Sequence, residues 1–110
     1  MPRTKIDSFK AKEIKLSQLA KALSHPARVS ILKTLAKCDE CVCGEIVDSI
    51  PLAQATVSQH LKELKNIGLI QGEIDGPRSC YCLDPKVVEE FSTLLNEFLS
   101  ELKNFRSSKC

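Results

Sequence analysis

The chain has 110 residues, of which 43% are hydrophobic, so it can form one domain whose small core is often completed by oligomerisation. No stretch is long and apolar enough to cross a bilayer, and the N-terminal segment lacks the hydrophobic part of a secretion signal, which predicts a cytoplasmic protein. The net charge is only +2, but residues 1–37 carry nine Lys or Arg against two acids, whereas residues 38–110 carry seven against twelve. This asymmetry favours an anionic partner, although solvated surface lysines produce the same pattern.

The first elements are predicted to be an arm and two helices. Residues 1–8 carry few apolar side chains and are expected to form a mobile arm. A helix is predicted from Phe9 to Leu23, with lysines over much of its outer surface. A second helix is expected to begin at Pro26 with Ser24 as its N-cap, since proline is favoured in the first helical turn. His25 has no second metal ligand beside it and is expected to be structural.

The stretch from Leu52 to Ile70 has the clearest helical pattern in the chain. A helix from Gln54 to Asn66 places three apolar residues on one narrow arc and small, polar or basic side chains opposite. Such a helix spans about 20 Å, and its short hydroxyl, amide and lysine side chains suit a DNA major groove. The apolar arc consists of Val57, Leu61 and Leu64, and the opposite side of Ala55, Ser58, Gln59, Lys62 and Asn66. An ordinary amphipathic surface helix has the same pattern, so the flanking segments decide between the two interpretations.

Those flanking segments predict a winged helix-turn-helix. A short helix is expected from Gly44 to Ile50, ended by Pro51. After the long helix, strands are expected at Leu69–Ile74 and Ser79–Leu83, joined by a turn at residues 75–77. Helix, turn, helix and hairpin in this order are typical of DNA-binding winged helices.

The last predicted helix, from Pro85 to Phe105, carries more apolar surface than one small core can cover. Its apolar residues are spaced by four, three, four and three, a heptad-like seam formed by Phe91, Leu95, Phe98, Leu102 and Phe105. We therefore expect a mainly α fold with a small β-hairpin, residues 9–105 forming one domain that dimerises through its first and last helices, and a flexible tail at 106–110. A two-fold dimer would place its recognition helices about 34 Å apart, one turn of DNA.

The motifs LSHPARVSILKTL and ATVSQHLKELKNIGLI, followed by the hairpin, resemble the ArsR/SmtB family of winged-helix repressors over roughly Lys12 to Phe105. The resemblance implies a homodimeric bacterial repressor that needs no cofactor to bind DNA and is released from its operator by a metal, metalloid or other thiol-reactive signal. Related sequences often carry a capping serine where this chain has Ala53, so the recognition helix is expected to begin more weakly here.

The candidate DNA contacts lie on the polar side of the recognition helix and at the wing. Gln59 can read the edge of adenine, and the neighbouring hydroxyls and lysine suit phosphates or a thymine methyl. Arg78, beside the wing tip, can enter the minor groove or bind phosphate. His60, at the edge of the apolar arc, is expected mainly to pack, with a phosphate contact besides. The predicted set is Gln54, Ala55, Thr56, Ser58, Gln59, His60, Lys62 and Arg78.

Six cysteines form the second candidate site, and in a reducing compartment they favour metal or redox chemistry over a structural disulfide framework. Cys41 and Cys43 share one face if their segment is extended, as Cys80 and Cys82 do on the second wing strand. In winged helices the segment before the third helix commonly pairs with that strand, which would bring four thiols within about 5 Å.

These four cysteines are predicted to bind a thiophilic inducer, As(III), Sb(III) or Cd(II), with Cys38 or Cys110 as further ligands. The arsenic-repressor motif itself is a CVC run followed closely by a third cysteine. This chain has CVC but carries Ile46 and Val47 where that third cysteine would stand. The family's other sensor site, carboxylates and histidines on the last helix, is excluded because residues 85–105 contain no histidine.

Three alternatives for the cysteines stay open. The same thiols could form disulfides in a redox or persulfide sensor. Cys38, Cys41, Cys80 and Cys82 could hold a structural zinc in a constitutive DNA-binding protein. The cysteines could also pack simply as small hydrophobes. An enzyme is not expected, because no catalytic grouping or phosphate-binding glycine loop is present.

Overall fold

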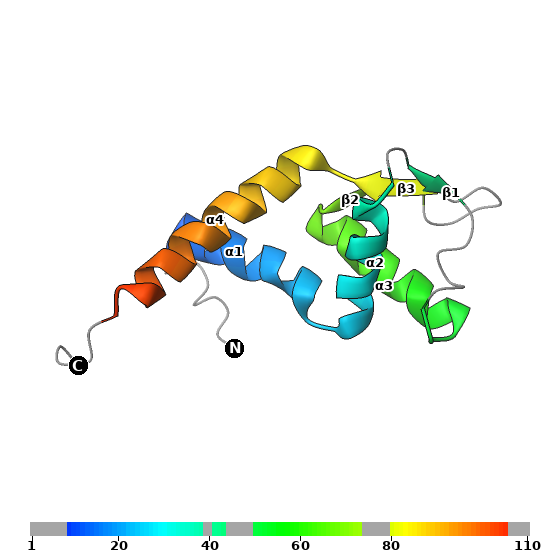
Figure 1. Cartoon of the computed structure of the whole chain (residues 1–110), viewed down its shortest axis with the longest axis horizontal. Helices are drawn as coiled ribbons and strands as arrows, with labels where there is room; N and C mark the ends of the chain where they lie inside the picture. The colour runs from blue at the N-terminus through cyan, green and yellow to red at the C-terminus, as the bar shows by residue number, and fades with distance from the viewer. Residues whose placement is uncertain (1–8, 39–40, 44–49, 74–79, 106–110) are drawn as a thin grey trace.

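A computed structural model describes residues 9–38, 41–43, 50–73 and 80–105. The predicted arm, the C-terminal tail with Cys110, the wing turn with Arg78 and nearly all of the predicted short helix at 44–50 lie outside these residues. The described elements are α1 (Ala11–Ala20), a 3-10 turn η2 (Lys21–Leu23), α2 (Pro26–Ala36), β1 (Val42–Cys43), α3 (Gln54–Ile67), β2 (Ile70–Glu73), β3 (Cys80–Leu83) and α4 (Pro85–Lys103). This order confirms the predicted winged helix-turn-helix with its small β-sheet (Figure 1).

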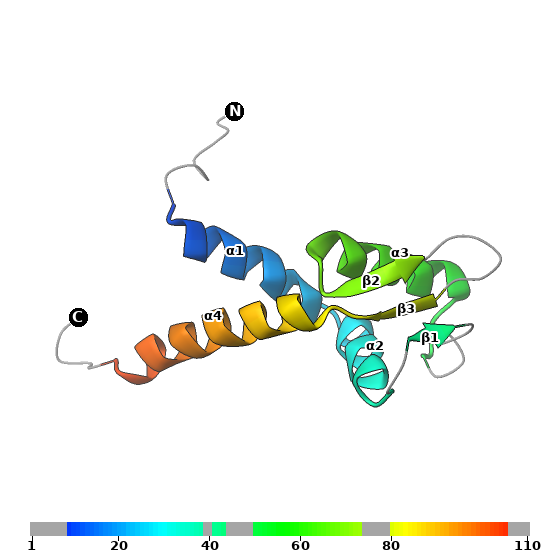
Figure 2. The same ribbon diagram turned by 90° about the horizontal axis from the view of Figure 1, so that it is seen from above.

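The molecule has two parts that meet at the start of α4. In one part, α2 and α3 pack beside the sheet; in the other, α1 lies against α4 (Figures 1 and 2). The predicted first helix is divided, because its last turn tightens into η2 before the chain turns into α2. No described helix is long and apolar enough to span a membrane.

The three-stranded antiparallel sheet has the order β1-β3-β2, with β3 in the centre. Ile70 pairs with Leu83 and Glu73 with Cys80 in the wing, while Val42 pairs with Tyr81 and Cys43 with Cys80 on the other edge. The segment that carries Cys41 and Cys43 therefore pairs with the second wing strand, as predicted.

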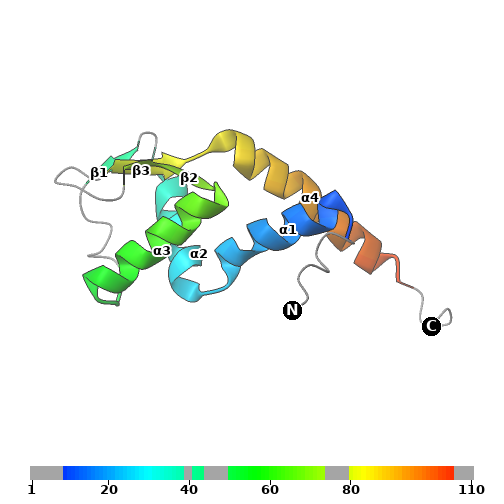
Figure 3. The ribbon, with the colours of Figure 1, turned by 180° about the vertical axis from the view of Figure 1, so that it is seen from behind.

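The core lies between α2, α3, the end of α1 and one face of the sheet. Its members are apolar apart from the hydroxyl of one tyrosine: Leu19, Ala22, Ala27, Ile31, Leu35, Ile50, Val57, Leu61, Leu64, Leu69, Ile70 and Tyr81. No residue of α4 is buried, although its first half contributes partly buried side chains to this core. The core therefore stabilises the part of the chain that contains the predicted recognition helix, whereas most of α4 projects from it (Figure 3).

Candidate functional site

Helix α3 presents the surface that the sequence predicts for DNA. Val57, Leu61 and Leu64 are buried, which confirms the predicted apolar arc. Of the predicted DNA contacts, Ser58 and His60 are half-buried and the following are exposed: Gln54, Ala55, Thr56, Gln59 and Lys62. The buried arc thus fixes the helix on the core and leaves its polar side facing outward.

The two ends of α3 are stabilised unequally. At the N-terminus Ala53 is the N-cap and supplies no side-chain hydrogen bond, because its methyl group has no acceptor atom. At the C-terminus Gly68 adopts φ 104°, and its N–H donates to the Leu64 carbonyl oxygen at 3.1 Å. This left-handed residue ends the helix and directs the chain into the wing strand β2.

The start of α2 differs from the prediction. His25, not Ser24, is the N-cap, and its Nδ1 accepts a hydrogen bond from the Ala27 N–H at 2.9 Å. The reason is Pro26 at the first helical position, since a proline favours an extended residue before it, and His25 has φ −149° and ψ 140°. The Ser24 hydroxyl instead donates to the Lys21 carbonyl oxygen at 2.7 Å. The expected structural role of His25 is thereby confirmed.

His60 is held from α2 rather than by its own helix. Arg28 Nε donates to His60 Nδ1 at 3.1 Å, and the His25 and His60 rings lie 4.6 Å apart between centroids. Burial lowers the pKa of His60, and the nearby His25 and Arg28 lower this pKa further against an opposing effect of Glu63. His60 is thus in contact with α2 on one side of the polar surface of α3.

The cysteines of β1 and β3 face each other in two pairs. Cys41 and Cys82 are joined by a disulfide with their Cα atoms 4.4 Å apart, and Cys43 and Cys80 by a second with a Cα separation of 4.0 Å. These separations are typical of non-hydrogen-bonded antiparallel pairs, in which side chains approach most closely. The structure therefore brings together the four cysteines that were predicted to cooperate.

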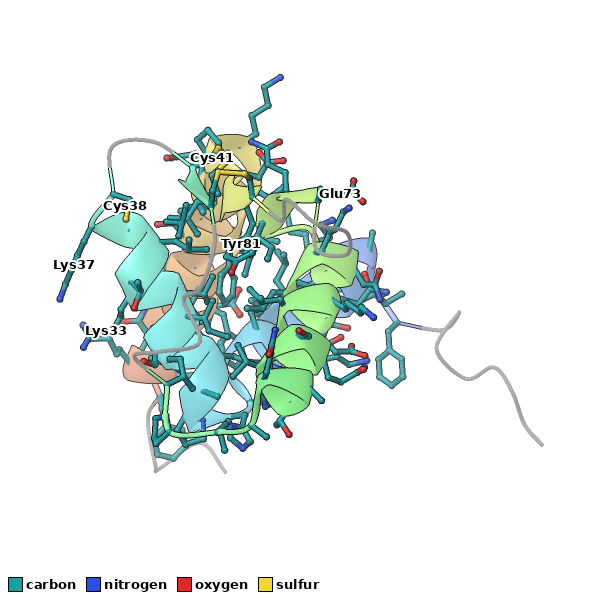
Figure 4. The ribbon with its side chains drawn as sticks, turned by 90° about the vertical axis from the view of Figure 1, so that its right-hand side faces the viewer. Lys33, Lys37, Cys38, Cys41, Glu73 and Tyr81 are labelled. Atoms are coloured by element: carbon teal, nitrogen blue, oxygen red, sulfur yellow. A yellow bond between two sulfur atoms is a disulfide. The ribbon has the colours of Figure 1, made fainter. Side chains whose placement is uncertain are left out.

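The cysteine pairs lie on the outer face of the sheet. Val42 and Tyr81 lie opposite each other on the two strands, between the two cysteine pairs. The Tyr81 side chain is buried between α2 and α3 (Figure 4). Because side chains alternate along a strand, the cysteines point away from this core, and Cys41 and Cys43 are exposed. They are accordingly accessible to a reagent without disruption of the core.

Two polar residues of the wing, which the sequence analysis did not single out, share the face with the cysteines. Glu73 pairs with Cys80, and Gln71 pairs with Cys82. Each cysteine pair therefore has a polar residue of β2 beside it on the same face of the sheet. The positions of Glu73 and Gln71 beside the cysteines depend on the register between β2 and β3. The alternation of side chains within each strand does not predict this register.

The thiols of the four cysteines could hold an ion only after reduction. With both disulfides formed, the described residues contain no group of three His, Cys, Asp or Glu side chains able to bind a metal. In the reduced protein each facing pair could bridge one ion, since metal–sulfur bonds of about 2.3 Å suit thiols at this separation. Cys38 is exposed at the end of α2, where its Sγ donates to the Thr34 carbonyl oxygen at 3.4 Å.

Comparisons with known proteins identify the family. Residues 25–71 match the family model described as bacterial regulatory protein, arsR family. An uncharacterized HTH-type transcriptional regulator of Methanocaldococcus jannaschii, MJ1325, is 34% identical over 76% of this chain and 93% of its own length. The chain belongs to the ArsR family. Its members are DNA-binding transcriptional regulators and not enzymes, in agreement with the sequence analysis.

Two further relatives have names that mention a metal or metalloid. A cadmium resistance transcriptional regulatory protein CadC homolog of Staphylococcus aureus is 35% identical, with 80% of this chain and 73% of the relative aligned. An arsenical resistance operon repressor of Staphylococcus xylosus is 29% identical, covering 86% of this chain and 95% of the relative.

A solved structure described as that of a possible ArsR-family transcriptional regulator has the same fold. It is a homodimeric winged helix-turn-helix DNA-binding domain from Mycobacterium bovis, similar at a TM-score of 0.60 and 23% identity over 94% of each chain. Because it covers 94% of this chain, the likeness includes α1 and α4 as well as the part that contains α2, α3 and the sheet.

Proposed function

We propose that the chain is a cytoplasmic transcriptional repressor that binds operator DNA as a homodimer and releases it when the cysteines of its sheet bind a thiophilic ion. The observation that carries the proposal is the shared strand β3. It pairs with β2 in the wing and with the cysteine-bearing β1 on its other edge. A chemical change at the cysteines therefore acts on the strand that positions the wing.

DNA binding is supported by the exposed polar side of α3. Gln59 is suited to read a base edge, and the hydroxyl and lysine side chains around it suit phosphates. The basic N-terminal third of the chain adds a favourable field for a polyanion. Arg78 would add a contact from the wing to the minor groove or a phosphate.

Dimerisation is supported by the unpaired apolar side of α4. The side chains of Phe98, Leu99 and Leu102 are 42–54% exposed in the single chain. Contact of these large apolar side chains with water is unfavourable, so the helix is expected to have a partner. Two-fold packing along α4 would cover them and present two α3 helices to successive turns of DNA. The homodimeric relative from Mycobacterium bovis provides the precedent.

The inducer would be As(III), Sb(III) or Cd(II), since soft ions prefer thiolate ligands. Cys41, Cys43, Cys80 and Cys82 would supply these thiolates in the reduced protein, with Cys38 or Cys110 able to add another. The names of the staphylococcal relatives support a response to such ions. A coupling of about 2.7 kcal/mol between ion and DNA would weaken operator binding a hundredfold.

The two disulfides favour a second candidate, a repressor that senses oxidants or persulfides. In this mechanism each facing pair of thiols loses two protons and two electrons to the oxidant as its S–S bond forms. Oxidation would lock β1 onto β3 without any metal. The same four cysteines would thus serve either mechanism, and the two mechanisms differ in the reagent that releases DNA.

The test is the binding of fully reduced protein to a fluorescein-labelled duplex selected from a random pool, followed by fluorescence anisotropy. Arsenite, cadmium or a disulfide-forming oxidant is then titrated into the complex. Release by a stoichiometric ion that is lost in Cys41→Ser and Cys43→Ser proteins, both still binding DNA, is the expected result. Cys38→Ser, a substitution outside the facing pairs, tests the further ligand: an unchanged response would leave the four paired cysteines as the whole site, and a weakened response would add Cys38 to it. Release by oxidant alone would favour the second candidate, and no release by any reagent would refute both.

A further inference from the structure

A cluster of three side chains joins the start of α2 to α3 and is not explained by helix packing alone. His25 lies at the N-terminus of α2, Arg28 in its first turn, and His60 on α3. Besides its bond to His60, Arg28 is fixed by its Nη1, which donates to the Lys21 carbonyl oxygen at 2.8 Å and to the Ser24 hydroxyl at 3.3 Å. The Arg28 side chain is therefore held in one orientation against the His60 ring.

The hydrogen bonds determine which ring nitrogens carry protons. A neutral imidazole has one N–H donor and one bare acceptor nitrogen. Nδ1 is the acceptor in both rings, from the Ala27 N–H in His25 and from Arg28 Nε–H in His60. Both neutral rings must then carry their proton on Nε2, which points away from the protein donor that occupies Nδ1.

The charged groups that act on His60 are of both signs, since Arg28 is cationic and Glu63, one turn further along α3, is anionic. Within the described part of the chain the ion pairs are Lys12 with Glu97 and Lys15 with Glu90, so Arg28 has no carboxylate partner there. His25 is exposed and His60 half-buried. Because a protein donor occupies Nδ1 in each ring, Nε2 is the ring nitrogen left to bind a ligand. His60 also directly follows Gln59 on the exposed polar side of α3.

We propose that His60 and His25 form a clamp for a backbone phosphate of the operator, each donating from its Nε2–H as a neutral ring. The clamp rests on the proposed function, because it needs DNA on the polar side of α3. Arg28 is a positioning residue, since it acts by fixing the tautomer and orientation of His60. A protonated His60 would place an Nδ1–H against Arg28 Nε–H and lose this bond, so the clamp operates with uncharged rings.

Neutral donors predict a distinctive salt dependence. A cationic side chain that neutralises a phosphate releases counterions, and its removal reduces the slope of log K against log salt by about 1. A neutral N–H donor contributes a hydrogen bond without this release. Loss of the His60 donor should therefore weaken DNA binding at every salt concentration and leave the slope unchanged.

Two substitutions separate the two nitrogens of His60. In His60→Asn the amide oxygen can replace Nδ1 as acceptor for Arg28, but the donor at the Nε2 position is lost. In His60→Gln the longer amide can place an N–H near the Nε2 position, while the acceptor for Arg28 is lost. We expect His60→Asn to bind the selected duplex about fivefold more weakly than His60→Gln, since a net hydrogen bond is worth about that factor. Lys62→Gln is the cationic control and should reduce the salt slope by about 1.

The tautomer of His60 can be measured without DNA. Nitrogen-15 NMR of the free wild-type protein should show the Nε2–H form of His60, and Arg28→Met should shift this ring toward a mixture of tautomers. An Nδ1–H tautomer in the wild type, equal affinity of the two His60 variants, or a lower salt slope for His60→Asn would overturn the clamp. If the wild type selects no duplex, the proposed function fails, and the NMR result still decides how His60 is held.

Discussion

Val42 lies directly opposite Tyr81 in the ladder between β1 and β3, and the Tyr81 side chain is almost fully buried. This single pair fixes the direction of its neighbours, because a shift of one residue would turn every side chain to the other face. With Val42 and Tyr81 directed to the core, the flanking cysteines must face outward in pairs. The register of a two-residue strand thus determines where the thiols meet.

Gly72 is expected to be indispensable for the wing. It adopts φ 126°, and an added Cβ would overlap the Cys80 carbonyl oxygen and lie 2.9 Å from the Tyr81 Cα. Gly72→Ala should therefore lower the free energy of unfolding by about 3 kcal/mol or displace β2 from β3, since both backbone strain and overlap must be relieved. Urea unfolding at fixed protein concentration measures the change.

The matched control for this substitution is Gly68→Ala. Gly68 also has a positive φ, 104°, but an added Cβ would meet only the Val87 methyl groups at 3.8 and 3.9 Å. Its cost should be about 1 kcal/mol, that of the left-handed conformation alone. Equal costs for the two variants would contradict the close approach of β3 to Gly72.

The N-terminus of α3 can be stabilised by one substitution. Because Ala53 provides no side-chain acceptor, Ala53→Ser should add a hydrogen bond to the first turn and raise the free energy of unfolding by about 1 kcal/mol. Ala36→Ser, at the exposed last position of α2, introduces the same side chain without a capping role. It should change the free energy of unfolding by at most a few tenths of a kcal/mol. A destabilised Ala53→Ser protein would argue against the observed helix start.

A charge on the exposed apolar side of α4 should separate the proposed dimer. Leu99→Asp would place a carboxylate in the interface. Sedimentation equilibrium should then show a dimer dissociation constant about a hundredfold larger than that of the wild type. Ser100→Asp adds the same charge to the next residue, which lies about 100° around the helix, and should leave the dimer intact. If the Leu99→Asp protein remained a dimer, the interface would have to lie on another surface of the chain.

Stability should depend on pH through His60. Its pKa in the folded protein is lowered from the ordinary value of 6.5, so the unfolded chain binds the proton more readily. The contribution of His60 is therefore complete above pH 6.5 and decreases as the pH falls below this value toward the lowered pKa. The decrease in unfolding free energy between pH 7.5 and pH 5.5 should be smaller in His60→Gln than in the wild type, when both are measured by urea unfolding. An equal decrease would show that His60 titrates normally in the folded protein.

The elements of this fold follow from local patterns, and the contacts between them do not. The apolar arc of α3 and the alternation in β3 were visible in the sequence because each repeats within a few residues. The sequence predicts Ser24 as the N-cap of α2, but Pro26 restricts the residue before it and so selects His25. The bond between Arg28 and His60 joins residues 32 positions apart and needs the packing of α2 on α3. Likewise, Glu73 meets Cys80 only through the register of the wing.

Because the cysteine pairs face outward, the proposed inducer site is separate from the core that stabilises the fold. Substitutions at Cys41, Cys43, Cys80 and Cys82 change an exposed or partly exposed face of the sheet and leave Val42 and Tyr81 in the core. In the reduced protein, where no disulfide is lost, new ligand types can be introduced at these four positions at little cost in stability, because surface changes are generally small in effect. Under the proposed function, the chain can therefore acquire a different inducer while it keeps the same operator.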